Sequence, residues 1–275
     1  MRFQRRLEAA KFALALEILP PQKPLPKVLL RRARLLEEFA EAINVIQRPG
    51  RQSSLEASVA LRAAGFEPAW HLVTRGRARE EVAADLGVAR AGGIDQVLCI
   101  LGDHPAAVAG EGLAIRDAIA MARDEIPGAF VGATLNQYGP DTEAVLRNLL
   151  PKLRAGASYV QTQPVFESRS VEKYAIAIDR ERPDTRIIAM AMPLLTLDAG
   201  QRIEARLGIR LPDALREMLA SGEPELAWSA FTATLADLVA APYIHGVAIM
   251  TFEGDAPAGT GPRIIAALRA AGAIE

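Results

Sequence analysis

One carboxylate stands inside an apolar run near the start of the chain. In "FALALEIL", residues 12–19, Glu17 is the charged residue, and Pro20 and Pro21 follow directly. Burial in such a run disfavours the ionised form, so we expect the pKa of this carboxyl to rise and the group to stay protonated near neutral pH. A buried, protonated carboxyl can act as a general acid. The structural alternative is that Glu17 caps a turn or pairs with an arginine.

Polar residues also stand at the ends of the other apolar runs. They are Gln47, His71 with Thr74, Asp103, Asn136, Gln163, and Thr251 with Glu253. Most of them form hydrogen bonds without carrying a charge. Two carboxylates and an amide-rich rim with few lysines suit a neutral heterocyclic ligand better than a phosphate-bearing sugar.

The runs that carry these residues predict buried strands. Each is short and rich in apolar or β-branched residues, as is typical of strands buried on both faces. The runs are residues 12–19, 42–47, 69–74, 96–102, 129–135, 159–163, 186–192 and 246–252. Between them, segments such as 26–42 and 54–65 carry apolar residues at helical spacing. The chain therefore alternates strands with helices.

This alternation predicts an α/β fold with a parallel sheet. Eight units in 275 residues match a single (β/α)8 TIM barrel over residues 1–275, with extra helices before the last strand. An open doubly wound sheet is the alternative. The first strand lacks a glycine-rich phosphate fingerprint, which argues against a dinucleotide-binding Rossmann domain. In a barrel, the chemistry lies at the carboxyl ends of the strands, where these polar residues would converge.

Composition excludes several other classes of function. With 32 basic and 33 acidic residues, the chain gives no electrostatic reason to expect a nucleic acid or membrane partner. Cys99 is the one cysteine, so neither an intrachain disulfide nor a cysteine-based metal site is expected. The three histidines are scattered without helical pairing, which predicts no metal site. The absence of a long apolar run or a recognisable leader favours a cytoplasmic protein.

Five short motifs occur in an informative order: "LEILPP", "HLVTRG", "LGDHP", "TQPVFE" and "GVAIMTF". Together they resemble the methylenetetrahydrofolate reductase family, and the similarity extends from about Phe12 to the last helix. It includes "RLGIRLPDALREML", which is similar to the helical insert of the family before the last strand. The resemblance implies NADH- or NADPH-dependent reduction of 5,10-methylenetetrahydrofolate through bound FAD, in one-carbon metabolism that serves methionine biosynthesis.

The resemblance also implies roles for particular residues. Glu17 matches the general acid that protonates the leaving nitrogen of the folate ring. Asp103 matches an aspartate near the flavin that also helps to hold the folate intermediate, although Gly-Asp after a strand is otherwise an ordinary turn. Gln163 matches the glutamine that binds the pterin ring, and its alternative is a structural amide at a strand end.

Three further residues match cofactor contacts. His71 aligns with a histidine at the flavin site, although a histidine on an apolar strand is often a core or rim residue. Lys152 falls where the family places a basic residue near the flavin phosphates, and Asn148 lies one helical turn earlier on the same face. The alternative for Lys152 is a solvated helix face.

The chain departs from the family pattern mainly at flavin contacts. Leu101 replaces an arginine before Gly-Asp, Thr134–Asn136 replace a Tyr-Pro-Glu stretch, and Met250–Glu253 replace Tyr-Thr-Leu-Asn. Three hypotheses follow: an FAD enzyme with a changed cofactor loop, direct hydride transfer without flavin, or a non-redox pterin-binding module that serves a methyl-transfer partner. The sequence leaves open the choice of NADH or NADPH, and it is compatible with a homo-oligomer.

Overall fold

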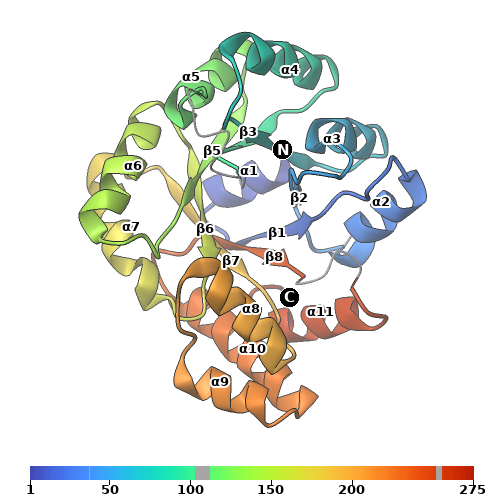
Figure 1. The fold of residues 1–275 in the computed structure, drawn as a ribbon, viewed down its shortest axis with the longest axis vertical. Helices are drawn as coiled ribbons and strands as arrows, with labels where there is room; N and C mark the ends of the chain where they lie inside the picture. The colour runs from blue at the N-terminus through green and yellow to red at the C-terminus, as the bar shows by residue number, and fades with distance from the viewer. Residues whose placement is uncertain (37, 103–111, 252–255) are drawn as a thin grey trace.

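Eight parallel strands close into a barrel (Figure 1). The computed structural model describes residues 1–36, 38–102, 112–251 and 256–275. The strands are β1 (Ala13–Ile18), β2 (Ala42–Val45), β3 (Pro68–Val73), β4 (Gln96–Ile100), β5 (Phe130–Leu135), β6 (Tyr159–Pro164), β7 (Arg186–Ala191) and β8 (Gly246–Met250). Because β1 pairs with β8, with Ala13 opposite Gly246, the sheet has no open edge. The predicted (β/α)8 barrel is confirmed, and the open sheet is excluded.

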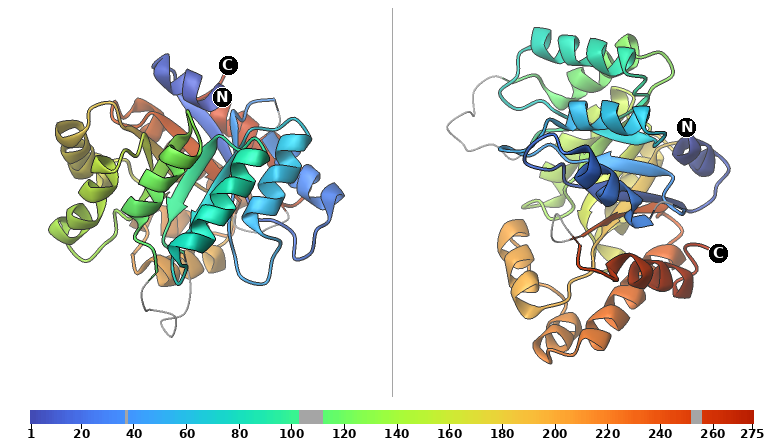
Figure 2. Two further views of the ribbon diagram at one scale, coloured as in Figure 1. Left: turned by 90° about the horizontal axis from the view of Figure 1, so that it is seen from above. Right: turned by 90° about the vertical axis from the view of Figure 1, so that its right-hand side faces the viewer.

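Helices surround the barrel and cover the outer faces of its strands (Figure 2). They are α2 (Pro26–Ala33) with the short 3-10 turn η1 (Arg34–Leu36), α3 (Ser54–Ala63), α4 (Arg79–Ala91), α5 (Ile115–Glu125), α6 (Thr142–Arg154), α7 (Arg169–Glu181) and α11 (Thr260–Ala270). Their starts follow local sequence rules. The Asp141 carboxylate accepts a hydrogen bond from the Ala144 N–H at 2.7 Å and so caps α6.

Three helices lie between β7 and β8, where one βα unit needs a single helix, so the chain carries the extra helices that the sequence predicts. They are α8 (Leu197–Leu207), α9 (Asp213–Ala220) and α10 (Pro224–Ala240). Met192, Leu194, Ile203, Leu211 and Leu219 are among the buried residues of a separate hydrophobic cluster in this region. In Figure 1 the three helices extend from one side of the barrel, and α8 lies in front, on the side of the carboxyl ends. The insert therefore adds a wall to that end of the barrel.

The amino end of the barrel is closed by a helix that the sequence analysis did not predict. In α1 (Arg2–Glu8), Phe3 and Leu7 are each 1% exposed. The Phe3 ring lies 6.2 Å from that of Tyr159 and 6.5 Å from that of Phe130, and the latter two rings stack at 4.9 Å. Two apolar residues four apart give one narrow stripe on an otherwise charged segment, which is a weak helical signal. Aromatic packing fills this end.

The pleat of the strands sorts their residues between two cores. Side chains two apart in a strand point the same way. On β1, Ala13 and Ala15 face the barrel interior, whereas Leu14 and Leu16 belong to the core beneath the outer helices. Glu17 continues the interior series, one layer above Ala15. The pleat of β1 therefore directs the Glu17 carboxyl into the open end of the barrel.

Candidate active site

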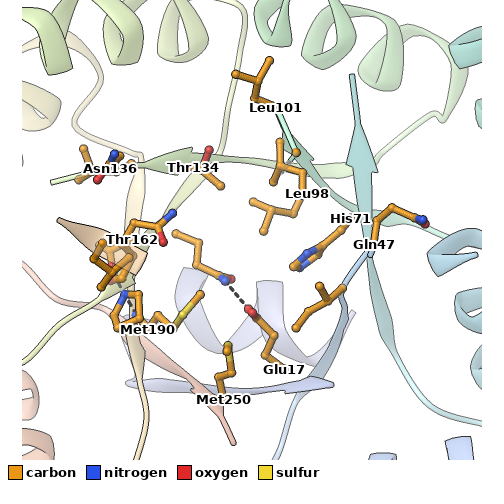
Figure 3. A pocket seen from close by; sticks show the side chains of 18 of the residues that line it. Glu17, Gln47, His71, Leu98, Leu101, Thr134, Asn136, Thr162, Met190 and Met250 are labelled. Atoms are coloured by element: carbon orange, nitrogen blue, oxygen red, sulfur yellow. Dashed lines mark hydrogen bonds between the residues drawn. The ribbon is translucent and has the colours of Figure 1, made fainter. Parts of the chain in front are cut away.

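A cavity of about 1190 Å³ opens at the carboxyl ends of the strands. Its wall includes the five described residues to which the family resemblance assigns a role: Glu17, His71, Asn148, Lys152 and Gln163. Figure 3 shows Glu17 and His71 pointing into this space from neighbouring parts of the barrel. The fold thus brings together residues that lie up to 146 positions apart in the chain. Two predicted site positions, Asp103 and Glu253, lie outside the described residues, as does His104.

Glu17 is a buried acid with a displaced pKa. Its side chain is 5% exposed, and burial raises its pKa to about 7. Hydrogen bonds with Gln161 and Asn44 and the charge of Arg206 act in the opposite direction, but burial outweighs them. Gln161 Nε2 donates to Glu17 Oε2 at 2.6 Å, the bond drawn as a dashed line from Glu17 in Figure 3. Near neutral pH this group can therefore both hold a proton and release it.

The sequence analysis missed Gln161, which lines the cavity, and Asn44, which contacts Gln161 inside the barrel. Asn44 lies beside Glu17 in the β1–β2 register, and its Nδ2 donates to Gln161 Oε1 at 2.6 Å. Both side chains are 2% exposed. Strand alternation could have found Gln161, because it shares the interior face with Gln163 in "YVQTQ". The search for polar residues at strand ends passed over it because it lies one layer deeper.

His71 offers an unused hydrogen-bonding atom to the cavity. The side chain is 4% exposed, and burial lowers its pKa to about 3, so the imidazole is neutral. Within the part of the chain that the structure describes, its Nε2 is buried without a hydrogen-bond partner. Buried polar atoms are nearly always paired. A ligand in this cavity would supply the missing partner.

Gln163 has a fixed backbone and a half-buried side chain. Its N–H donates to Gln137 Oε1 at 3.0 Å, and its carbonyl oxygen accepts from Gln137 Nε2 at 3.0 Å. The Gln137 amide therefore holds the end of β6 in place. The side chain of Gln163 lines the cavity and can offer both a donor and an acceptor. Its predicted contact with a pterin ring stays a prediction.

Helix α6 presents Asn148 and Lys152 to the same cavity. The two residues are one turn apart, so they share a face. Lys152 Nζ donates to the Thr134 carbonyl oxygen at 2.8 Å, and burial lowers its pKa to about 8. Asn148 Nδ2 donates to the Ala144 carbonyl oxygen at 3.1 Å. Lys152 thus lies against the end of β5 and not on a fully solvated helix face.

The cavity wall is more basic than the strand ends suggested. Among the described residues, seven basic side chains line it, against the single acid Glu17: Arg31, Arg32, Arg48, Arg75, Lys152, Arg202 and Arg206. Four of these arginines belong to α2 and α8. A search of strand ends could not find side chains that reach the cavity from helices. Arg202 pairs with Asp198 at 2.9 Å, so part of this positive charge is already compensated.

The described residues contain no group of three or more histidines, cysteines, aspartates or glutamates placed to hold a metal ion. Among those residues, none of the helices combines the length and apolarity that crossing a bilayer requires.

Similarity to known proteins agrees with this geometry. The family model described as methylenetetrahydrofolate reductase matches residues 2–254. None of the curated proteins matches the chain. A solved structure described as a putative deoxyribose-phosphate aldolase from Coccidioides immitis shares 16% identity over 74% of this chain and 81% of its own, with a TM-score of 0.47, too low to bear on function. Because the family match spans nearly the whole barrel, the chain belongs to the methylenetetrahydrofolate reductase family.

Proposed function

We propose that this protein reduces 5,10-methylenetetrahydrofolate to 5-methyltetrahydrofolate with NADH or NADPH, and that Glu17 is the general acid. The observation that carries the proposal is a buried carboxyl with a pKa of about 7 facing the cavity of a family member. A general acid works best when its pKa lies near the operating pH. An exposed glutamate would be ionised under the same conditions and could not donate.

The reaction explains why an acid is needed. The methylene carbon bridges two nitrogens, and it accepts hydride readily only after one carbon–nitrogen bond breaks. Glu17 gives its proton to the leaving nitrogen, the ring opens to an iminium, and hydride adds to the iminium carbon to form the methyl group. One proton and one hydride are consumed, and Glu17 is left as a carboxylate that must be reprotonated from solvent.

The other residues would bind and orient the reactants. Gln163 would pair with the edge of the pterin, since an amide supplies both donor and acceptor. The unpartnered Nε2 of His71 and the ammonium of Lys152, with Asn148 beside it, fit the polar parts of a flavin. Bound FAD would relay hydride from the nicotinamide to the folate. A role for Asp103 at the folate and the flavin rests on the resemblance alone.

Direct hydride transfer without flavin is the second candidate. The observation that favours it is Leu101, which is 44% exposed at the cavity wall where the family pattern has an arginine. Thr134, Leu135 and Asn136 also line the cavity in place of the flavin-binding stretch of the family. The positions that depart from the family pattern are therefore mainly those of flavin contacts, whereas Glu17 and Gln163 are kept.

An absorbance spectrum of the purified protein, followed by an NADH and NADPH oxidation assay with methylenetetrahydrofolate, separates the hypotheses. A flavin spectrum with turnover supports the FAD route. A colourless protein that turns over supports direct transfer. A colourless protein that binds folate without turnover would contradict the reductase proposal and leave a pterin-binding module that serves a methyl-transfer partner.

A further inference from the structure

Three buried polar side chains form one connected group in the interior of the barrel. Asn44 comes from β2, Gln161 from β6 and Glu17 from β1, and each is 2–5% exposed. The hydrogen bonds from Asn44 to Gln161 and from Gln161 to Glu17 measure 2.6 Å each, and Asn44 also interacts directly with the Glu17 carboxyl. Side-chain pairs buried this deeply are costly unless their hydrogen bonds are satisfied. Their joint placement therefore calls for an explanation beyond packing.

The direction of these bonds follows from the protonation state of Glu17. An ionised carboxylate can only accept, so Gln161 must turn its NH2 group towards Glu17. Its carbonyl oxygen then faces Asn44, which must turn its own NH2 group towards Gln161. The structure shows this arrangement, with Asn44 donating to Gln161 and Gln161 donating to Glu17.

A protonated Glu17 permits the reverse arrangement. Its O–H can donate to Gln161 Oε1, provided that the Gln161 amide turns over. Gln161 Nε2 would then donate to Asn44 Oδ1. Both end states keep two hydrogen bonds, because each amide carries a donor and an acceptor.

We propose that Asn44 and Gln161 form a two-amide relay that positions Glu17. The donor and acceptor roles of the two amides reverse when Glu17 loses or regains its proton. Both amides are positioning residues and not catalytic ones. The relay would prevent the carboxylate that remains after proton donation from being stranded without a partner inside the barrel. Its catalytic consequence rests on the proposed acid role of Glu17, but its existence does not.

Other titratable groups around Glu17 do not take over this task. Burial leaves His71 neutral and raises the pKa of Tyr159, so neither exchanges a proton near neutral pH. Arg206 favours the carboxylate through its charge. The remaining basic residues that reach this cavity from α2, α6 and α8 are Arg31, Arg32, Lys152 and Arg202. Lys152, whose pKa is lowered to about 8, also titrates near neutral pH, but its ammonium donates to the Thr134 carbonyl oxygen. The amides differ from these cations because each carries a donor and an acceptor and can exchange the two roles.

Infrared difference spectroscopy of the ligand-free full-length protein tests the relay. The carbonyl band of protonated Glu17 would be followed from about pH 5 to about pH 9, with Glu17→Gln subtracted as the reference. Hydrogen bonds to the charged form are the stronger ones. We therefore expect Gln161→Met to raise the titration midpoint by about one pH unit, and Asn44→Leu to raise it by less. A side-chain amide band should change together with Glu17 and weaken in Gln161→Met, where the Asn44 amide alone remains beside the carboxyl.

Gln201→Met is the matched control, since it makes the same substitution as Gln161→Met at an exposed glutamine of α8, and its midpoint should equal that of the native protein. If Asn44→Leu does not fold, Asn44→Ser provides the same test. An unchanged midpoint in the Asn44 variant would overturn the relay, and an unchanged midpoint in Gln161→Met would overturn the positioning of Glu17. A Glu17 titration without an amide signal would overturn the reversal. None of these readouts requires folate or nicotinamide, so failure of the proposed reaction would be seen separately.

Discussion

At the scale of single residues, the environment of Glu17 links catalysis to a loss of stability. Burial keeps the carboxyl protonated near neutral pH, which the proposed chemistry requires. The same burial makes the ionised form expensive to hold in the folded protein. Substituting one side chain can therefore reveal both effects.

Glu17→Gln should slow folate reduction by about 10²–10⁴-fold, the usual contribution of general acid catalysis. The amide keeps the shape and the hydrogen-bonding reach of the side chain but has no acidic proton. Rapid-mixing kinetics with methylenetetrahydrofolate measure this step. If flavin is bound, its reduction by nicotinamide needs no such proton and serves as the internal control. Equal slowing of both steps, or an unchanged folate step, would remove Glu17 from the mechanism.

The same variant should be more stable than the native protein in alkaline solution. The pKa of Glu17 is about 7 in the folded state, whereas the ordinary value of a glutamate is 4.5, so the folded state binds more protons between these limits. The free energy of unfolding therefore falls as pH rises from about 4.5 to above 7. Below this range, Glu17 adds no pH dependence to the free energy of unfolding. Urea unfolding measures the free energy of unfolding of Glu17→Gln and of the native protein. The difference in favour of Glu17→Gln should be about 1–3 kcal/mol larger at pH 8 than at pH 5. A pH-independent difference would contradict the raised pKa.

Lys152 should make binding of a phosphate-bearing cofactor sensitive to pH. Its pKa is lowered to about 8, and an anion prefers the protonated ammonium, so affinity should fall as pH rises through that value. Lys152→Met should weaken binding of NADH or FAD by about 10–100-fold at pH 7 and flatten the pH dependence, as titration calorimetry would show. Lys173→Met, an exposed lysine on α7, is the control. The same pH profile in both variants would exclude Lys152 as the cause.

At the scale of elements, the strands were predictable because each is a short, continuously apolar run. The spacing of those runs was enough to predict the barrel, and the rule that strand ends carry chemistry found Glu17, His71 and Gln163. The rule did not find Asn44 and Gln161, which lie inside the barrel. It also could not find Arg202 and Arg206, since the orientation of α8 depends on packing between distant segments.

Close packing between strands also makes a glycine of β5 sensitive to substitution. A Cβ at Gly132 would lie 2.3 Å from the Tyr159 ring, which is already stacked on Phe130. Gly132→Ala should therefore destabilise the fold by about 1–3 kcal/mol, measured by urea unfolding. Gly87→Ala on α4 meets no atom within 4 Å and should instead stabilise by up to about 1 kcal/mol. Equal effects of the two variants would show that the ring can move away.

At the scale of the whole molecule, one end of the barrel provides packing and the other provides function. The interior changes from aromatic rings near α1 to amides and a carboxyl at the cavity. This division lets the open end depart from the family pattern while the closed end keeps the barrel together. The departures at Leu101 and Thr134–Asn136 can then alter cofactor binding without altering the fold.

Flavin retention tests this separation. If FAD binds, we expect part of it to be lost during extensive dialysis, because these positions lack the usual polar contacts. Absorbance before and after dialysis measures the loss, and far-ultraviolet circular dichroism should show the fold unchanged. Stoichiometric flavin after dialysis would mean that other contacts replace the missing ones.

The position of α1 in the chain has a consequence for the order of assembly. The helix precedes every strand, yet the rings that receive Phe3 belong to β5 and β6, and Ala248 of β8 joins the same cluster. During synthesis α1 therefore emerges well before its binding site exists. Its two apolar side chains therefore remain exposed to solvent, or bound to a chaperone, until the strands that follow have been synthesised. Helix α1 is thus synthesised early but is among the last elements to pack against the barrel.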